Sequence, residues 1–397
     1  MTSEVTAPKP TSSAAPPPSF PFGRSGFFQS PPEFTRLRAT APVSRVVTAD
    51  NGQAWLVTRQ DDVRFVLSNQ AFVAYSGIAD SPFEDPSAHT RLRKLMSHAF
   101  TARRVERLRP RTREIAADLV TQMTRLEAPV DLVQAFALPL PIIVICELLG
   151  IPVADRAEFR RWADAILAVT ACTPEEAGQA GQDLNSYMSS LIAEKQRSSV
   201  SEDLLSALIA VRDRDDAQLS DTELVTIAVG LIIAGYVTPS NAVGLAVIYL
   251  LAHQQLEVLR DNPALIPAAV EETLRYQSGR NGESMPRVAV QDVRIGGVLI
   301  RAGERVVAPL ESANHDERRV ANPERFDISR RENSHLAFGI GIHHCPGAAL
   351  ARVELQVAFE ALARRVPRLH LAVPAEELPI TVNMFGDQVP SAIPVGW

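Results

Sequence analysis

The spacing of apolar residues near the beginning of the chain predicts a small β region. Two apolar stretches, 43–49 (VSRVVTA) and 54–58 (AWLVT), flank an Asp-Asn-Gly turn at 50–52. Alternating apolar residues on both sides of such a turn are typical of a β-hairpin. Residues 59–69 (RQDDVRFVLSN) follow with helical spacing and predict a short helix.

Helical spacing dominates the middle of the chain, from about residue 89 to residue 261. Thr101 and the Thr173-Pro174 pair are expected helix starts, because threonine can cap a helix and proline fits its first position. A second hairpin is predicted at 293–307, with a Gly-Gly turn. One more helix and a short β tail complete a single, mainly helical domain with small β-sheets.

The N-terminal residues differ in composition from the rest of the chain. Residues 1–34 are rich in proline, serine and alanine, and we expect a flexible leader there. They contain no apolar segment of the kind that signal peptides and anchors need. The folded domain is expected at 35–397. Aromatic residues and prolines at 70–88 show no clear periodicity, which predicts a long loop.

One segment is apolar enough to raise the question of a membrane. Residues Leu224 to Ala252 contain no charged side chain and could span a bilayer. Glycine, proline and polar residues interrupt the segment, and the sequence offers no second span. We therefore predict a long helix buried in the centre of a helical domain, and no membrane association.

Charge and cysteine content narrow the classes of function. The net charge of -6 gives no general attraction to nucleic acid, so we expect no nucleic-acid partner. Cys146, Cys172 and Cys345 are too few and too widely spaced for a disulfide framework or a zinc module. They are compatible with a reducing compartment, and we expect a cytoplasmic protein.

Residues 338–352 (FGIGIHHCPGAALAR) carry the strongest chemical signal. A zinc site at His343, His344 and Cys345 would require three adjacent side chains to converge on one ion. A nucleophilic cysteine would need a base that the fold places beside it. A thiolate ligand to haem iron uses every unusual residue. Glycines let the backbone approach a flat macrocycle, and the helix that follows favours a negative sulfur.

The same segment resembles the haem-binding signature of the cytochrome P-450 superfamily, and the likeness extends over nearly the whole chain after the leader. The resemblance implies the mainly helical fold of that family, haem b as cofactor and Cys345 as the axial ligand of the iron. The positions that match the signature are Phe338, Gly339, Gly341, His343, Cys345, Gly347, Leu350, Ala351 and Arg352.

Other segments resemble further parts of the family. Glu272 and Arg275, three residues apart on a predicted helix, match a pair that locks the core in the family. Arg325 in the segment NPERFD matches the usual third member of that group. The resemblance implies that Phe338 and Gly347 lie against the cofactor. It also implies four propionate-binding side chains: His89, Arg93, Arg287 and His343.

The predicted oxygen-binding stretch departs from the family pattern. Residues 231–240 (LIIAGYVTPS) resemble the part of the central helix that reads small-Gly-x-acid-Thr in the family. Ala234, Gly235 and Thr238 match this pattern. Val237 stands where the acid is expected, and valine cannot carry a proton. The proline that follows Thr238 also removes a backbone donor from the helix.

The resemblance implies oxidation of a small aromatic or hydrophobic secondary metabolite with O2. Insertion of one oxygen atom is the first hypothesis. Oxidative coupling, for example of aromatic diketopiperazines, is the second, because it requires less proton delivery. A non-enzymatic haem sensor is an alternative of another class. The implied substrate walls are Phe72, Tyr75, Phe83, Ile233, Ser284, Met285 and Phe385.

A separate ferredoxin or flavodoxin is expected to supply the electrons. Its docking face should be basic, because such small electron carriers are acidic. The candidate side chains on the thiolate side are Lys94, Arg103, Arg104, Arg352, Arg364 and Arg365.

Overall fold

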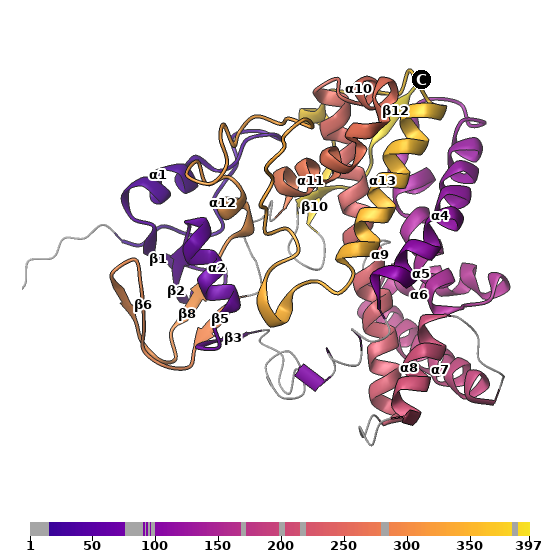
Figure 1. Ribbon diagram of the computed structural model, residues 1–397, viewed down its shortest axis with the longest axis horizontal. Helices are drawn as coiled ribbons and strands as arrows, with labels where there is room; N and C mark the ends of the chain where they lie inside the picture. Colours follow the sequence, from indigo (N-terminus) through magenta and orange to yellow (C-terminus); the bar gives the residue numbers. More distant parts are fainter. Residues whose placement is uncertain are drawn as a thin grey trace, which may run out of the picture.

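The computed structural model describes residues 16–75, 90, 91, 93, 96, 100–167, 172–197, 203–214, 220–278, 286–382 and 388–397. These residues form a helical part around one long helix and a smaller part that holds most of the strands (Figure 1). The predicted fold class, mainly helical with small sheets, is confirmed.

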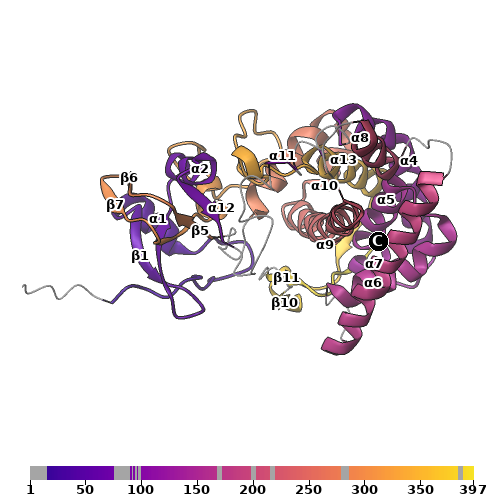
Figure 2. The same cartoon turned by 90° about the horizontal axis from the view of Figure 1, so that it is seen from below.

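The helical part packs around α9 (Asp221–Ala252), which Figure 2 shows end-on. α5, α7, α11 and α13 all contact it. The other helices are α4 (Ala102–Met123), α5 (Pro139–Leu149), α6 (Arg156–Ile166), α7 (Pro174–Arg197), α8 (Leu204–Arg214), α10 (Leu256–Asp261), α11 (Ile266–Gln277) and α13 (Ala348–Arg365).

The central helix α9 begins at a capping box. The Ser220 hydroxyl accepts a hydrogen bond from the Glu223 amide at 3.2 Å, and the Glu223 carboxylate accepts one from the Ser220 amide at 2.9 Å. By length and composition α9 could cross a membrane, but 61% of its most apolar window is buried inside the protein. A core helix meets the same criterion, so α9 is the buried central helix that the sequence predicts.

The strand-rich part contains a five-stranded sheet in the order β1-β2-β8-β5-β3. Its strands are β1 (Val43–Val47), β2 (Gln53–Val57), β3 (Phe72–Ala74), β5 (Arg287–Ala289) and β8 (Arg305–Val307). The helices α1 (Pro32–Thr40), α2 (Gln60–Ser68) and α12 (Leu310–Asn314) belong to the same part (Figure 1).

Three smaller sheets complete the structure. β6 (Val293–Ile295) pairs with β7 (Val298–Ile300), and β10 (Ile380–Val382) pairs with β11 (Gln388–Pro390). The third sheet has the order β4-β12-β9, formed by β4 (Val130–Asp131), β9 (His370–Leu371) and β12 (Pro394–Gly396).

Both predicted hairpins are confirmed. β1 and β2 are antiparallel, and Asn51 in their turn has φ 60°, a left-handed conformation that asparagine tolerates. β6 and β7 are joined by Gly296 and Gly297, with φ 55° and 84°. The helix starts are also confirmed. The Thr101 hydroxyl accepts from the Arg104 amide at 3.3 Å, and the Thr173 hydroxyl accepts from the Glu176 amide at 3.2 Å.

The predicted flexible leader is wrong for residues 16–34. Phe20 and Phe34 are each 1% exposed, and their rings pack edge to face. The Phe20 amide donates to the Val47 carbonyl at 2.8 Å, which ties this segment to the edge of β1. The average composition concealed these phenylalanines, which bury enough apolar surface to order a proline-rich segment.

The long loop predicted at 70–88 is interrupted by a strand. β3 pairs antiparallel with β5, from Phe72 opposite Ala289 to Ala74 opposite Arg287. Three residues are too few to show a periodic pattern, so only the partner strand makes this segment recognisable. Residues 76–88 lie outside the described part of the chain.

Candidate active site

A tight backbone loop holds Cys345 in front of α13. The Cys345 amide donates to the Phe338 carbonyl at 2.8 Å, and the Gly339 amide donates to the Leu336 carbonyl at 2.8 Å. Gly339 and Gly341 have φ 67° and 77°, values that favour glycine. The loop therefore takes its shape from local sequence, and α13 begins three residues after the cysteine.

Gly341 is also required by packing. A Cβ atom at Gly341 would lie 2.9 Å from the Cα of Ser68 and 3.1 Å from the carbonyl oxygen of Leu67. Both are backbone atoms at the end of α2, so they cannot move aside easily. This glycine lets the cysteine loop contact the strand-rich part, a reason that differs from the expected clearance for a macrocycle.

The surroundings of Cys345 raise the pKa of its thiol on balance. Burial raises the pKa of the thiol, whereas the backbone amides of Gly347 and Ala348 and the cations Arg93 and Arg352 act to lower it. Bound iron would keep such a sulfur deprotonated. Within the described residues, no three His, Cys, Asp or Glu side chains form a metal cluster, so the zinc alternative has no support.

A cavity of about 500 Å³ lies between the cysteine loop and α9. Cys345, Phe338, His343 and Gly347 line it from the loop, and most of its surface is apolar. A single soft thiolate, a glycine beside it and a large apolar cavity fit a haem group held through its iron. The sequence predicts that Phe338, His343 and Gly347 contact that group, and all three line the cavity.

The opposite side of the cavity includes one turn of α9. Ala234, Gly235 and Thr238 line the cavity there, and Pro239 follows them. The Thr238 hydroxyl donates to the Ala234 carbonyl at 2.6 Å, which fixes it beside the cavity. A Cβ atom at Gly235 would lie 3.1 Å from the Ile145 Cδ1, so glycine here allows α5 to pack closely on α9.

Val237 and Tyr236 point elsewhere. Val237 is 4% exposed and packs in the main hydrophobic core, outside the residues that line the cavity. The Tyr236 hydroxyl donates to Asp164 on α6 at 2.5 Å. Burial, and to a smaller extent this hydrogen bond, raise the pKa of Tyr236. Neither side chain can deliver a proton into the cavity.

The predicted propionate ligands are placed only in part. Arg93 donates to the carbonyl of His344 in the cysteine loop, and burial lowers its pKa. His343 lines the cavity. Arg287 on β5 is 6% exposed, and burial lowers its pKa to about 10, which favours an anionic partner. His89 lies outside the described residues.

The three predicted substrate residues that the structure describes do not line this cavity. Phe72 is buried against Phe65, with ring centroids 6.3 Å apart. Tyr75 is 38% exposed below the Arg305 guanidinium, and Ile233 packs against the core. These three predictions are not supported by the geometry of the cavity. Phe83, Ser284, Met285 and Phe385 lie outside the described residues.

The predicted structural pair is confirmed, but its third member is wrong. Glu272 and Arg275 form two hydrogen bonds of 2.8 Å, and both side chains are 0% exposed. The side chain of Arg325 is 74% exposed and contributes only its carbonyl oxygen, 3.4 Å from Arg275. Arg330 instead binds Glu272 at 3.1 Å, and Asn333 donates to it at 3.0 Å.

A second ion-pair group supports the cysteine loop and was not foreseen. Arg352, expected on a docking face, donates to both carboxylate oxygens of Glu271 at 2.7 and 2.9 Å. Its guanidinium lies 4.6 Å from the ring centroid of Phe338. Burial acts to raise the pKa of Glu271, but hydrogen bonds from His335 and Arg352 lower it to about 2. Glu271 directly precedes Glu272, a doubling that could have signalled a second role.

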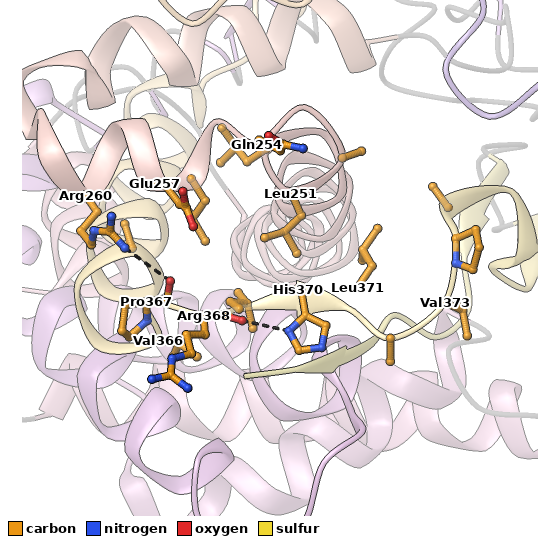
Figure 3. Close-up of a pocket in the computed structure, with 18 of the residues that line it drawn as sticks. Leu251, Gln254, Glu257, Arg260, Val366, Pro367, Arg368, His370, Leu371 and Val373 are labelled. Atoms are coloured by element: carbon orange, nitrogen blue, oxygen red, sulfur yellow. Dashed lines mark hydrogen bonds between the residues drawn. The ribbon is translucent and has the colours of Figure 1, made fainter.

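A larger hollow of about 870 Å³ lies at the C-terminal end of α13, the end away from the cysteine loop, between that end, the end of α9 and the strand β9 (Figure 3). Arg260 donates to the Pro367 carbonyl at 3.5 Å there, and His370 contacts the Arg368 carbonyl at 2.9 Å. None of the predicted site residues lines this hollow. Size alone therefore does not identify the active site, and the chemistry at Cys345 does.

Comparison with known proteins agrees with this geometry. The family model described as Cytochrome P-450 matches residues 171–258 and 259–367. The chain is 43% identical to "Mycinamicin IV hydroxylase/epoxidase" of Micromonospora griseorubida, over 97% of this chain and 100% of that protein. It is 42% identical to "Nocardicin C N-oxygenase" of Nocardia uniformis subsp. tsuyamanensis, over 96% and 98% of the two chains.

Solved structures give the same result. A mutant of the mixed-function enzyme MycG in complex with mycinamicin IV matches with a TM-score of 0.90 and 42% identity, covering 96% of this chain and 100% of that chain. The LnmA hydroxylase of Streptomyces atroolivaceus matches with a TM-score of 0.88 and 40% identity, covering 95% and 99%. Because sequence identity and overall fold agree with these proteins over nearly the whole chain, the chain belongs to the cytochrome P-450 family of haem-thiolate monooxygenases.

Proposed function

We propose that this monooxygenase inserts one atom of O2 into a small hydrophobic secondary metabolite that binds in the cavity between Cys345 and α9. The observation that carries the proposal is that Cys345 and Thr238 line the same, largely apolar cavity. Cys345 would hold haem b, and the thiolate-bound haem would supply the activation of oxygen.

The protein residues have separate tasks in this reaction. The loop that carries Cys345 fixes the sulfur through its backbone bonds, and Arg352 holds α13 against α11 through Glu271. Thr238 presents a hydroxyl at the cavity surface and is oriented by the Ala234 carbonyl. The apolar walls exclude water from most of the cavity and favour a hydrophobic substrate.

We also propose that electrons come from a separate ferredoxin in the cytoplasm. α4 and α13 pack together, and Arg103, Arg364 and Arg365 lie exposed on these two helices. Arg103 lies near the start of α4, and Arg364 and Arg365 lie together at the end of α13; exposed cations of this kind suit an acidic electron carrier. All three cysteines are free, as expected in a reducing compartment.

Oxidative coupling, the second hypothesis for this site, finds no support in the comparisons, because the two curated relatives described above carry names of oxygen-inserting enzymes. A haem sensor finds no support in these names either.

Product mass separates the two reactions. The holoenzyme, with NADPH, a plant-type ferredoxin and its reductase, is incubated with a panel of hydrophobic natural products that includes mycinamicin IV. Compounds are first chosen by the spectral shift they induce in the haem band. We expect a product heavier than the substrate by one oxygen atom, with incorporation of label from ¹⁸O2. A product of twice the substrate mass less two hydrogens would establish coupling and refute the proposal.

A further inference from the structure

Arg352 places a positive charge close to the Cys345 sulfur. It lies on the second turn of α13, where its guanidinium covers the ring of Phe338 at 4.6 Å from the centroid. The carbonyl of Phe338 in turn accepts a hydrogen bond from the Cys345 amide at 2.8 Å. Burial raises the pKa of the Cys345 thiol, and Arg352, like Arg93, acts to lower it. Arg352 therefore belongs to the electrostatic surroundings of the iron ligand.

Glu271 on α11 holds this cation in place. Its two carboxylate oxygens accept hydrogen bonds of 2.7 and 2.9 Å from Arg352. Such a two-point bond between planar groups fixes direction as well as distance. Hydrogen bonding to Glu271 raises the pKa of Arg352, and the negative charge of Cys345 acts in the same direction to a smaller extent. The charge of Arg352 therefore interacts with both Glu271 and the sulfur.

His335 fixes the other side of Glu271. Its Nε2 lies 3.0 Å from the carboxylate, and its side chain is 3% exposed. Its Nδ1 accepts a hydrogen bond from the Ala337 amide at 3.2 Å, so the ring carries its hydrogen on Nε2 and donates it to Glu271. The ring then contributes a hydrogen bond but no full charge. The full charge that Glu271 meets is the one on Arg352.

Glu271 and Glu272 are adjacent on α11 but act on different parts of the protein. Glu272 binds Arg275 and Arg330 in the interior, where its side chain is 0% exposed. Glu271 is 29% exposed and binds the helix that follows the cysteine loop. Because its partner Arg352 also acts on the sulfur, the charge of Glu271 affects the iron ligand as well as the packing of the two helices.

We propose that Glu271 is a positioning residue that tunes the iron ligand: it orients Arg352 and offsets its charge, and thereby keeps the haem reduction potential low. A cation without its counter-charge would stabilise negative charge on the sulfur. The sulfur would then donate less electron density to the iron, and the iron would be reduced more readily. This inference rests on Cys345 as the haem ligand and on the electron supply of the proposed function, but not on the product formed.

The redox step concerned is the uptake of one electron. A reduced ferredoxin gives one electron to the ferric haem, so the haem becomes ferrous and the ferredoxin is oxidised. The haem site becomes more negative by one charge in this step. A nearby unpaired cation therefore favours the reduced form, and a nearby unpaired anion favours the oxidised form. Loss of Glu271 and loss of Arg352 should act in opposite directions.

A potential titration of the holoenzyme tests these signs. Dithionite supplies the electrons through redox mediators at pH 7 and low salt, because salt screens partly exposed charges. The haem absorbance gives the reduced fraction. At the potential that half-reduces the native haem, we expect the ratio of reduced to oxidised haem to be several-fold higher in Glu271→Gln and several-fold lower in Arg352→Met. The double variant with both substitutions should return close to the native ratio.

Two further variants separate charge from mechanical support. Arg352→Lys keeps the positive charge but loses the two-point bond, so we expect a lower urea midpoint and a potential close to the native value. Glu360→Gln is the matched control on α13, because Glu360 pairs with Arg113 and Arg364 at 3.0 and 3.1 Å, and we expect no change of potential.

The signs of the shifts decide the outcome of the titration. Shifts in the same direction for Glu271→Gln and Arg352→Met, or no shift in either, would overturn the proposal. If Arg352→Met does not retain haem, the comparison of Glu271→Gln with Arg352→Lys decides. A higher potential in the first variant alone supports the proposal, and equal potentials in the two refute it.

The stretching frequency of CO bound to the reduced protein provides a readout that mechanical support does not move in opposite directions. Electron donation from the sulfur weakens the C–O bond and lowers this frequency. In infrared spectra we therefore expect the frequency to rise in Glu271→Gln, to fall in Arg352→Met and to stay at the native value in the double variant and in Glu360→Gln. A band that only broadens in the Glu271 and Arg352 variants would show mechanical support alone and contradict the proposal.

These measurements also separate the inference from the proposed function. If the potential and the frequency shift as expected while product analysis shows coupling, the tuning role of Glu271 stands and oxygen insertion fails. If oxygen is inserted and both quantities are independent of Glu271, the inference fails and the proposed function stands.

Discussion

Replacement of Arg330 or Arg325 by alanine tests the structural group around Glu272. The sequence favours Arg325 as the third member, whereas the structure places Arg330 there. Arg330→Ala removes a buried charge-assisted bond to Glu272 at 3.1 Å. It also removes bonds to the carbonyls of Ala321 at 2.8 Å and Arg325 at 3.1 Å. Arg325→Ala removes an exposed side chain whose contact to Asp327 is 4.0 Å.

The two substitutions should lower the stability of the protein by clearly different amounts. The Arg330 side chain is 12% exposed and Glu272 is 0% exposed, so solvent screens their interaction little. Hydrogen bonds to charged groups contribute about 1.5–3 kcal/mol each. Loss of one partner of a buried charge pair costs about 3–5 kcal/mol. Because Arg275 continues to neutralise Glu272, we expect about 2–4 kcal/mol for Arg330→Ala, and less than about 0.5 kcal/mol for Arg325→Ala.

Urea unfolding of the holoenzyme provides the measurement. Midpoints are followed both by circular dichroism and by the haem absorbance, so that loss of the cofactor and loss of helix are separated. The urea midpoint of Arg330→Ala should fall well below that of the native protein. The midpoint of Arg325→Ala should stay close to the native value. Equal destabilisation by the two substitutions, or a larger effect at Arg325, would refute the assignment of Arg330.

Three further predictions concern the site. Cys345→Ala should abolish the strongly red-shifted absorption band of the reduced, CO-bound protein, whereas Cys146→Ala should retain it; a band that survives loss of Cys345 contradicts the assigned ligand. The double substitution Arg93→Ala with Arg287→Ala should weaken haem binding without eliminating it, because each charged bond contributes about 1.5–3 kcal/mol, and unchanged haem affinity would remove both from the propionate site. The pKa of Glu271 is lowered from 4.5 to about 2, so its pairing stabilises the folded protein above pH 4.5 and this contribution is lost as pH falls toward 2. Glu271→Gln should therefore reduce stability at pH 7 more than at pH 2.5, and a loss independent of pH would show that the pairing is not electrostatic.

The sequence alone determined the features that depend on neighbouring residues. The hairpin turn at Asn51, the helix starts at Thr101 and Thr173 and the loop around Cys345 all follow from short-range backbone chemistry. Turns, caps and glycine-dependent loops are fixed within a few residues. The haem-binding signature is of the same kind, because its glycines and its helix start lie next to the cysteine.

Only the tertiary structure decided which side chains meet across the fold. Arg325 and Arg330 both stand near the residues that match the family pattern, and the packing of their segment on α11 selects Arg330. Phe20 orders a segment that composition assigns to a leader, because β1 lies beside it. Val237 likewise faces the core because helices far away in the sequence pack against it. Burial and its effect on charge arise from such distant contacts, which no local pattern records.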